Sequence, residues 1–313
     1  MYQIFIDGKE GTTGLQIFER LRVMDDIEIL QIESQKRKNE VEKREVIREA
    51  DLVVLCLPDE MSKKVVQANS DMSVKVIDAS TAFRTDPNWT YGLPELSISQ
   101  AEEIRNAECV SNPGCYPTGF LMLVKPLIEQ GILKKNSVLN ISAISGYSGG
   151  GRKLIERYDG FNSEKVSARP YGLNMAHKHL PEMTKYSGLL SEPLFLPIVA
   201  NFYQGMTVSV PLQRGMFIGK VSIKNVHEVL SNAYEPNKNI TVFGLNDEEQ
   251  LQDGFLNPHI IKGTDRQEIF IYGHDEQMVL ISRLDNLGKG ASGAAIQNLN
   301  LMLGFPEYRG LAI

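Results

Sequence analysis

The stretch Gln3-Ile4-Phe5-Ile6-Asp7-Gly8-Lys9-Glu10-Gly11-Thr12-Thr13-Gly14 decides the fold class of this 313-residue chain. Its apolar beginning is typical of a buried strand, and three glycines follow at once. The apolar residues after the loop recur at helical spacing: Leu15, Ile17, Phe18 and Leu21. A strand, a glycine-rich loop and a helix predict the start of a dinucleotide-binding unit. Glycine lets the backbone approach a pyrophosphate, and the helix N-terminus supplies N–H donors.

The glycine spacing is G-x-x-G-x-x-G rather than G-x-G-x-x-G, so the loop alone fits an ordinary strand–helix turn equally well. The unit also requires a second strand, which we expect over residues 27–32, before Glu33-Ser34-Gln35-Lys36-Arg37-Lys38. An acidic residue here binds the ribose 2′-OH of NAD, whereas Ser, Lys and Arg accommodate the 2′-phosphate of NADP. Ser34, Arg37 and their two lysine neighbours favour NADP, and a solvated charged loop is the alternative.

Three further apolar runs, residues 52–57, 74–78 and 108–111, predict more strands of one parallel sheet. Ligands of such sheets bind outside the carboxyl ends of the strands. Ser80 and Arg84 follow the second of these runs and are therefore ligand-binding candidates. Arg84 can grip a phosphate or a carboxylate with two hydrogen bonds, and a surface salt bridge is its alternative role.

The stretch Ser111-Asn112-Pro113-Gly114-Cys115-Tyr116-Pro117-Thr118 follows the last of these strands. Its Pro-Gly pair imposes a tight turn, and its second proline suits the first turn of a helix. Cys115 is therefore expected at a helix N-terminus, where unpaired N–H groups and the helix dipole favour a thiolate. This position predicts a nucleophilic cysteine, with packing as the alternative. Cys56 and Cys109 are assigned to packing.

The second half of the chain changes pattern after the cysteine. Strands are expected over 137–145, 195–199 and 206–210, and a hairpin over 268–281, which together predict an α+β region with a mixed or antiparallel sheet. The loop Gly146–Lys153 combines flexible backbone with two cations and suits phosphate.

Two histidines, His177 and His179, stand in the stretch Ala176-His177-Lys178-His179-Leu180-Pro181-Glu182. An imidazole is the usual general acid or base near neutral pH. No cysteine or carboxylate cluster completes a ligand set around them, so we expect no metal site.

Composition excludes several classes of function. The net charge is −6 and no basic stripe with interleaved aromatic residues occurs, which argues against a nucleic-acid partner. The beginning of the chain does not resemble a signal peptide, and no apolar run reaches membrane-spanning length. Three scattered cysteines predict neither a disulfide framework nor a zinc site, so we expect a cytoplasmic protein.

Seven stretches, taken in order, resemble the N-acetyl-gamma-glutamyl-phosphate reductase family, and the length and opening resemble its shorter type. They are GTTG at 11–14, DASTAFR at 78–84, YGLPE at 91–95, SNPGCYPT at 111–118, SGYSGGGRK at 145–153, HKHLPE at 177–182 and NLGKGASGAAIQN at 286–298. The resemblance covers essentially the whole chain. Related aspartate-semialdehyde and glyceraldehyde-phosphate dehydrogenases share this architecture and chemistry.

The resemblance implies NADPH-dependent reduction of N-acetyl-L-glutamyl 5-phosphate to N-acetyl-L-glutamate 5-semialdehyde and phosphate, in arginine biosynthesis. Cys115 would form a thioester, and a histidine, His179 rather than His177, would act as acid and base. The substrate-binding candidates are Arg84, Ser145 and Tyr171. The cofactor-binding candidates are Gly8, Gly11, Thr12, Thr13, Gly14, Ser34, Arg37, Ser80, Gly149 and Asn298.

The fold class expected is α/β, with a Rossmann-type parallel-sheet domain and an α+β domain. We expect residues 1–114 and 287–313 to form the NADP-binding domain and 115–286 the catalytic and dimerisation domain, in a homodimer or homotetramer. Two alternatives stay open: a related reductase acting on an aminoadipyl or aspartyl phosphate, and a non-catalytic NADP-sensing protein.

Overall fold

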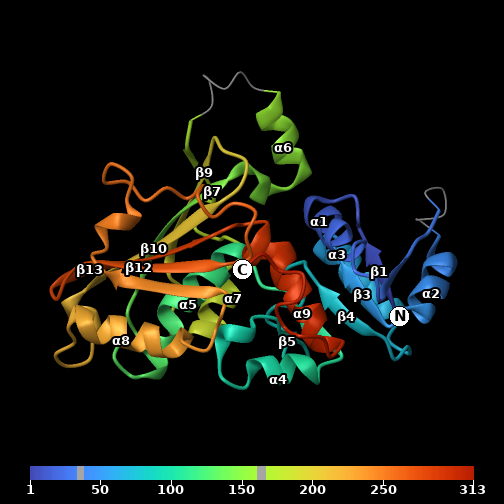
Figure 1. Ribbon diagram of the computed structural model, residues 1–313, viewed down its shortest axis with the longest axis horizontal. Helices are drawn as coiled ribbons and strands as arrows, with labels where there is room; N and C mark the ends of the chain where they lie inside the picture. Colours follow the sequence, from blue (N-terminus) through green and yellow to red (C-terminus); the bar gives the residue numbers. More distant parts are fainter. Residues whose placement is uncertain (34–38, 161–166) are drawn as a thin grey trace. The chain divides into compact units, whose positions relative to one another are not determined.

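A computed structural model describes residues 1–33, 39–160 and 167–313. The chain divides into two compact units (Figure 1). Unit 1 contains Met1–Pro113 and Ala291–Leu311, and unit 2 contains Gly114–Gly290 and Ala312–Ile313. The boundaries expected from the sequence fall after residues 114 and 286, whereas the units change after Pro113 and Gly290.

Unit 1 is built on a six-stranded sheet in the order β2-β1-β3-β4-β6-β5. Its strands are β1 (Tyr2–Asp7), β2 (Ile27–Leu30), β3 (Leu52–Leu55), β4 (Lys75–Asp78), β5 (Thr90–Tyr91) and β6 (Cys109–Ser111). Every neighbouring pair is parallel. The predicted Rossmann-type parallel sheet is therefore confirmed.

Helices cover both faces of this sheet, which explains why its strands are apolar throughout. They are α1 (Thr12–Leu21), α2 (Glu40–Glu49), α3 (Asp59–Ala68), α4 (Gln100–Arg105) and α9 (Gly293–Met302), with the 3₁₀ turn η1 (Pro94–Leu96). Successive β1 side chains point to opposite faces. Ile4 and Ile6 pack in a cluster with residues of α1, α4 and α9, whereas Phe5 packs in a cluster with residues of α2 and α3.

Unit 2 contains a seven-stranded sheet in the order β11-β12-β13-β10-β7-β9-β8. Its strands are β7 (Asn140–Gly146), β8 (Arg169–Pro170), β9 (Leu194–Ala200), β10 (Met206–Gln213), β11 (Ile240–Leu245), β12 (Gln267–His274) and β13 (Gln277–Leu284). The pairs β7–β9 and β11–β12 are parallel and the other neighbours antiparallel, so the sheet is mixed, as predicted. Strands β12 and β13 form the expected hairpin.

The helices of unit 2 include α5 (Cys115–Glu129), α6 (Arg152–Asp159), α7 (Leu180–Ser187) and α8 (Ile223–Tyr234). Its shorter turns include η2 (Tyr147–Gly150), η4 (Arg214–Met216) and η5 (Glu248–Gln250), and the π-helical turn η6 (Gly288–Ser292) begins in this unit. Helix α5 packs against β10, β13, α7 and α8. It approaches β10 so closely that a Cβ on Gly119 would lie 2.7 Å from Val208 Cγ2. In the described part of the chain, no helix combines the length and apolar character needed to cross a membrane.

Candidate active site

Cys115 is the first residue of α5, as the sequence predicts. Gly114 is the N-cap, with φ −76° and ψ 149°, and its carbonyl accepts hydrogen bonds from the backbone N–H and the hydroxyl of Thr118 at 2.9 Å. The backbone is thus extended at Gly114, and the helix begins at the next residue, Cys115. The Cys115 side chain leaves the backbone beside the N–H groups of the first helical turn, which stabilise an anion.

The turn η6, which follows β13, lies directly against this cysteine. A Cβ built on Gly290 would stand 2.8 Å from Cys115 Cβ, so a larger residue here would displace Cys115 or the turn. The Gly290 N–H donates to the Asp285 carbonyl at 2.9 Å. The Asp285 carboxylate in turn accepts from the Gln204 amide at 2.8 Å and the Leu287 N–H at 2.9 Å. The sequence analysis did not find this support of Cys115.

Helix α7 is tied to the start of α5 by Glu182. This side chain is 1% exposed, and its Oε2 accepts a hydrogen bond from the Gly114 N–H at 3.2 Å. His179 is the N-cap of the same helix and is buried. The sequence analysis quoted Glu182 within its motif but gave it no role. A carboxylate three residues after a histidine, just inside a helix, is the signal that was available.

Five rings form what we call the aromatic cluster: Tyr116, Tyr171, His177, His179 and Phe195. The ring centroids of His177 and His179 are 4.8 Å apart, and those of His177 and Phe195 are 5.0 Å apart. Tyr116 has both histidine rings at 5.9 Å and Phe195 at 5.0 Å. Tyr171 lies 5.8 Å from His177. The structure therefore brings together side chains that the sequence places on α5, β9 and the segment before α7.

His177 and His179 differ in their surroundings. Burial, together with the charge of Lys178, lowers the pKa of His177 to about 4. Its Nδ1 accepts a hydrogen bond from the His179 backbone N–H at 3.2 Å, which requires an unprotonated nitrogen at that position. His177 is consequently a neutral acceptor near pH 7 and holds the backbone of its neighbour.

The two tyrosines bring hydroxyl groups close to the cysteine. Tyr171 donates to the Tyr116 hydroxyl at 3.1 Å. Burial, with a smaller contribution from the charge of Cys115, raises the pKa of Tyr171 to about 12 and that of Tyr116 well above 10. Both hydroxyls therefore stay protonated and remain donors. Ser145, near the end of β7, donates to the Gly146 carbonyl at 3.1 Å. A side-chain hydrogen bond with Ser145 also lowers the pKa of Tyr116, against the larger effect of burial.

Gly149, a predicted cofactor contact, lies in η2 of unit 2. A Cβ there would meet Ser145 Oγ at 3.3 Å and Asn286 Nδ2 at 3.5 Å. The glycine thus lies beside a substrate-binding candidate, and its assignment to the cofactor remains a prediction.

In unit 1, the predicted glycine loop joins β1 to α1. Gly8 has φ +88°, and a Cβ on it would lie 2.4 Å from the Cys56 carbonyl oxygen of the segment after β3. A Cβ on Gly14 would lie 2.4 Å from the Gly8 carbonyl oxygen. Gly11 is the N-cap, so Thr12 and Thr13 supply the first N–H groups of α1. The first and third glycines are therefore required by close packing of strand, loop and helix.

Ser80 and Arg84 follow β4, and both are buried. The Ser80 hydroxyl donates to Asp78 Oδ2 at 2.6 Å, and burial raises the pKa of that carboxyl. Arg84 Nε donates to the Asn112 carbonyl at 2.9 Å and Nη2 to the Ala79 carbonyl at 3.2 Å. The alternative role of Arg84 in a surface salt bridge is wrong, because the side chain is 7% exposed and fixes the segments that follow β4 and β6.

Asn298 lies on α9 with no exposed surface. Its Nδ2 donates to the Gly92 carbonyl at 2.9 Å and to Asn112 Oδ1 at 3.1 Å, whereas its Oδ1 has no hydrogen-bond partner among the described residues. A buried acceptor without a donor marks a place where a ligand can complete the bonding. This observation fits the predicted carboxamide contact of a nicotinamide ring.

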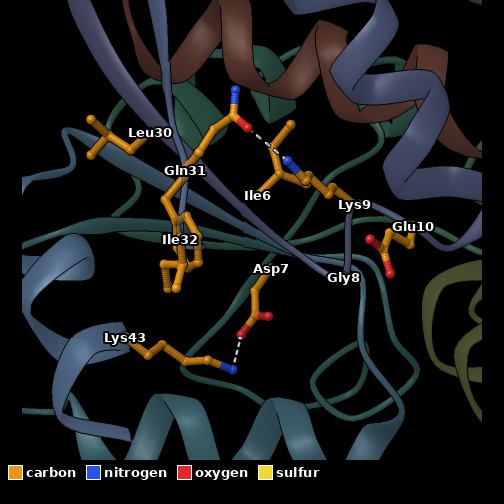
Figure 2. A pocket seen from close by; sticks show the side chains of 10 residues that line it. Ile6, Asp7, Gly8, Lys9, Glu10, Leu30, Gln31, Ile32 and Lys43 are labelled. Carbon is orange, nitrogen blue, oxygen red and sulfur yellow. Dashed lines mark hydrogen bonds and ion pairs between the residues drawn. The ribbon is translucent and has the colours of Figure 1, made fainter. Parts of the chain in front are cut away.

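A pocket of about 160 Å³ opens at the carboxyl ends of β1 and β2 (Figure 2). Asp7 and Lys43 meet on one side of it, and Lys9 and Gln31 on another. The sequence analysis gave none of these four residues a role. The predicted NADP contacts Ser34 and Arg37 lie outside the described residues. Among residues 1–33, 39–160 and 167–313, no cluster of three His, Cys, Asp or Glu side chains is suited to a metal ion.

Comparison with known families agrees with this architecture. Residues 3–107 match the family described as "Semialdehyde dehydrogenase, NAD binding domain", and residues 115–286 match "Semialdehyde dehydrogenase, dimerisation domain". An aspartate semialdehyde dehydrogenase from Francisella tularensis has the same fold, with a TM-score of 0.74 at 15% identity over 97% of this chain and 100% of that one. The enzyme from Candida albicans, solved with NADP, gives a TM-score of 0.65 at 12% identity over 97% and 98%. Fold and site together define a protein of the semialdehyde dehydrogenase class.

Curated relatives narrow this class. The N-acetyl-gamma-glutamyl-phosphate reductase 2 of a Nostoc species is 47% identical over 318 aligned positions, covering 99% of both chains. The protein of the same name from Pseudomonas putida is 43% identical and covers 98% of both. The chain belongs to the N-acetyl-gamma-glutamyl-phosphate reductase family, and it is an oxidoreductase. The resemblance drawn from seven short stretches is confirmed.

Proposed function

We propose that this chain reduces N-acetyl-L-glutamyl 5-phosphate with NADPH, giving N-acetyl-L-glutamate 5-semialdehyde and phosphate, in arginine biosynthesis. The observation that carries the proposal is the position of Cys115 at the start of a buried helix, close to two protonated tyrosines, one of which has both histidine rings at 5.9 Å. The names of the full-length relatives support the choice of substrate.

In the proposed reaction, the Cys115 thiolate attacks the acyl carbon, the bond from carbon to the phosphate oxygen breaks, and a thioester remains. A nicotinamide, when bound, would supply the hydride that reduces a thioester to the aldehyde level. His179 removes the thiol proton before the attack, later protonates the oxygen of the thiohemiacetal and takes that proton back as the carbon–sulfur bond breaks. His177 holds the backbone of His179 and moves no proton, because its low pKa and its acceptor Nδ1 keep it neutral.

Residues of both units fit the groups that this reaction needs. The loop Gly8–Gly14 and the N-terminus of α1 suit the pyrophosphate of a nicotinamide dinucleotide, with Ser80 and Asn298 as further contacts, and the unpartnered Asn298 Oδ1 supports this fit. Arg84 would bind the substrate phosphate. Ser145 and Tyr171 would bind the acyl group near Cys115.

Two alternatives remain distinct from this proposal. An aminoadipyl or aspartyl phosphate differs from the proposed substrate mainly in chain length or acylation, and one methylene changes binding by only about 1–3 kcal/mol. A non-catalytic NADP sensor would not need a histidine pair packed against Tyr116, the residue that follows a cysteine at a helix N-terminus.

The phosphate-dependent reverse reaction tests the function, with NADP reduction followed by absorbance. We expect turnover of N-acetylglutamate semialdehyde in preference to aspartate semialdehyde and aminoadipate semialdehyde. Cys115→Ser should reduce turnover at least roughly 1,000-fold, because a hydroxyl at this position is a much poorer nucleophile than a thiolate. Cys109→Ser, at a half-buried position in β6, is the matched control. If another aldehyde is preferred, the substrate assignment is wrong but the mechanism stands. Activity of the Cys115→Ser variant would refute the thioester mechanism.

We also infer a homodimer built through unit 2, in the cytoplasm. On β7 and β9, every second side chain faces away from the covering helices, and three of these are exposed apolar residues: Ile144 at 37%, Leu194 at 50% and Leu196 at 41%. A second copy of the chain is the occupant that fits, since the matching family is described as a dimerisation domain. Leu196→Asp should produce monomers in sedimentation. A wild-type chain that sediments as a monomer would contradict the dimer, and a tetramer would show a further interface.

A further inference from the structure

The pocket at the carboxyl ends of β1 and β2 is framed by two pairs of side chains (Figure 2). Lys43 Nζ, on α2, donates to Asp7 Oδ2 at 2.6 Å. Lys9 Nζ, in the glycine loop, donates to Gln31 Oε1 at 3.0 Å. At about 160 Å³, the pocket is smaller than the roughly 300–1,000 Å³ of a site for a whole drug-sized ligand. It suits one fragment of a dinucleotide, such as a phosphorylated sugar.

The polar side chain that lines this pocket after β2 is an amide, whereas Glu33, two positions further on, is not among the lining residues. In the Rossmann fold, a carboxylate at this point accepts hydrogen bonds from the ribose 2′-OH. Here the pocket is lined after β2 by Gln31, whose amide oxygen already accepts from Lys9. Two carboxylates also line the pocket: Asp7, which comes from β1 and is paired with Lys43, and Glu10 of the glycine loop.

The Asp7–Lys43 pair is partly withdrawn from water, with side chains 12% and 16% exposed. Coulomb forces act more strongly there than between solvated surface charges. An ammonium carries three N–H donors. Among the described residues, Lys43 donates one hydrogen bond, to Asp7, and Lys9 donates one, to Gln31. Two ammonium groups, with the carboxylates of Asp7 and Glu10, therefore line a pocket that suits a phosphorylated sugar. In the Rossmann fold, the adenosine ribose of a dinucleotide binds near the end of the second strand.

We propose that Lys9 and Lys43 determine cofactor specificity by binding the 2′-phosphate of the adenosine ribose of NADP(H). This inference rests on the proposed use of a nicotinamide dinucleotide and deepens it. Asp7 holds the Lys43 ammonium at the pocket wall. Its own charge opposes a phosphate, so the pair sets how strongly the pocket attracts a dianion.

Calorimetric titration of the full chain with 2′,5′-ADP and with 5′-AMP tests this without any turnover. We expect wild type to bind 2′,5′-ADP more tightly. Lys43→Gln and Lys9→Gln should each weaken 2′,5′-ADP about tenfold, the effect of losing one hydrogen bond to a charged group. Binding of 5′-AMP should change less than about twofold, as should both affinities in the control Lys63→Gln on the exposed face of α3.

The double variant Asp7→Asn/Lys43→Gln separates direct binding from neutralisation. If Lys43 merely cancelled the charge of Asp7, the double variant would regain wild-type affinity for 2′,5′-ADP, which would overturn the inference. Direct binding keeps it weaker than wild type, and Lys9→Gln tests the same idea without disturbing the pair. A wild type that prefers 2′,5′-ADP while both lysine variants bind unchanged would overturn the inference and leave the proposed function intact. A wild type that binds neither nucleotide would refute the proposed function itself.

Discussion

The candidate site residues of unit 1 and those around Tyr116 in unit 2 make different kinds of contact. In unit 1, predicted site residues contact the backbone. Gly8 packs against the Cys56 carbonyl, Arg84 donates hydrogen bonds to two carbonyls, and Asn298 donates one to the Gly92 carbonyl. In unit 2, rings and hydroxyls contact one another around Tyr116, the residue after Cys115. A cofactor with a fixed shape can be held by a shaped backbone, whereas bond-making needs side chains with tuned proton affinity.

The largest effect on kcat is expected from replacing one particular histidine of the pair, His179. His179→Asn should lower kcat roughly 100- to 10,000-fold, the usual contribution of a general acid–base. His177→Asn should lower kcat far less, because the amide replaces a neutral acceptor. Steady-state kinetics at pH 7 measure both. Equal losses in the two variants would mean that His177 also transfers a proton.

The free energy of unfolding should depend on pH because of His177. The pKa of His177 is lowered from 6.5 to about 4, so the folded chain binds fewer protons than the unfolded chain between these values. Its contribution to stability is present above pH 6.5 and is lost as the pH falls towards about 4. Denaturation of His177→Asn should therefore depend less on pH between 4 and 6.5 than that of wild type. Parallel pH curves for the two chains would contradict the buried neutral imidazole.

Glycines sharpen the comparison between the two units. Gly8→Ala forces a side chain into a positive-φ position and against a carbonyl, and should lower the free energy of unfolding by about 1–3 kcal/mol. Gly149→Ala meets its nearest atom at 3.3 Å and should cost less. Urea denaturation compares them. If Gly149→Ala proved as harmful, the η2 turn would be as constrained as the glycine loop.

Local signals in the sequence predicted much of this structure. The strand–glycine–helix start, the helix beginning at Cys115 and the β12–β13 hairpin each depend on neighbouring residues, which is why they could be found. Glu182 bonds Gly114 across 68 positions, and Tyr171 bonds Tyr116 across 55. Such pairs depend on how α7 and the strands pack against α5, which no local pattern encodes. Lys43 and Asp7 were missed for the same reason.

A last pair of variants, at Glu182, separates the effect of charge from that of hydrogen bonding. Glu182→Ala leaves the buried Gly114 N–H without its acceptor and should lower the free energy of unfolding by about 1–3 kcal/mol. Glu182→Gln keeps an acceptor oxygen at the same place, so most of that stability should return, measured by urea denaturation of both variants. If Glu182 positions the start of α5 only through this bond, Glu182→Gln also restores kcat. Stability that returns while kcat does not would instead give the carboxylate charge a role beside Cys115.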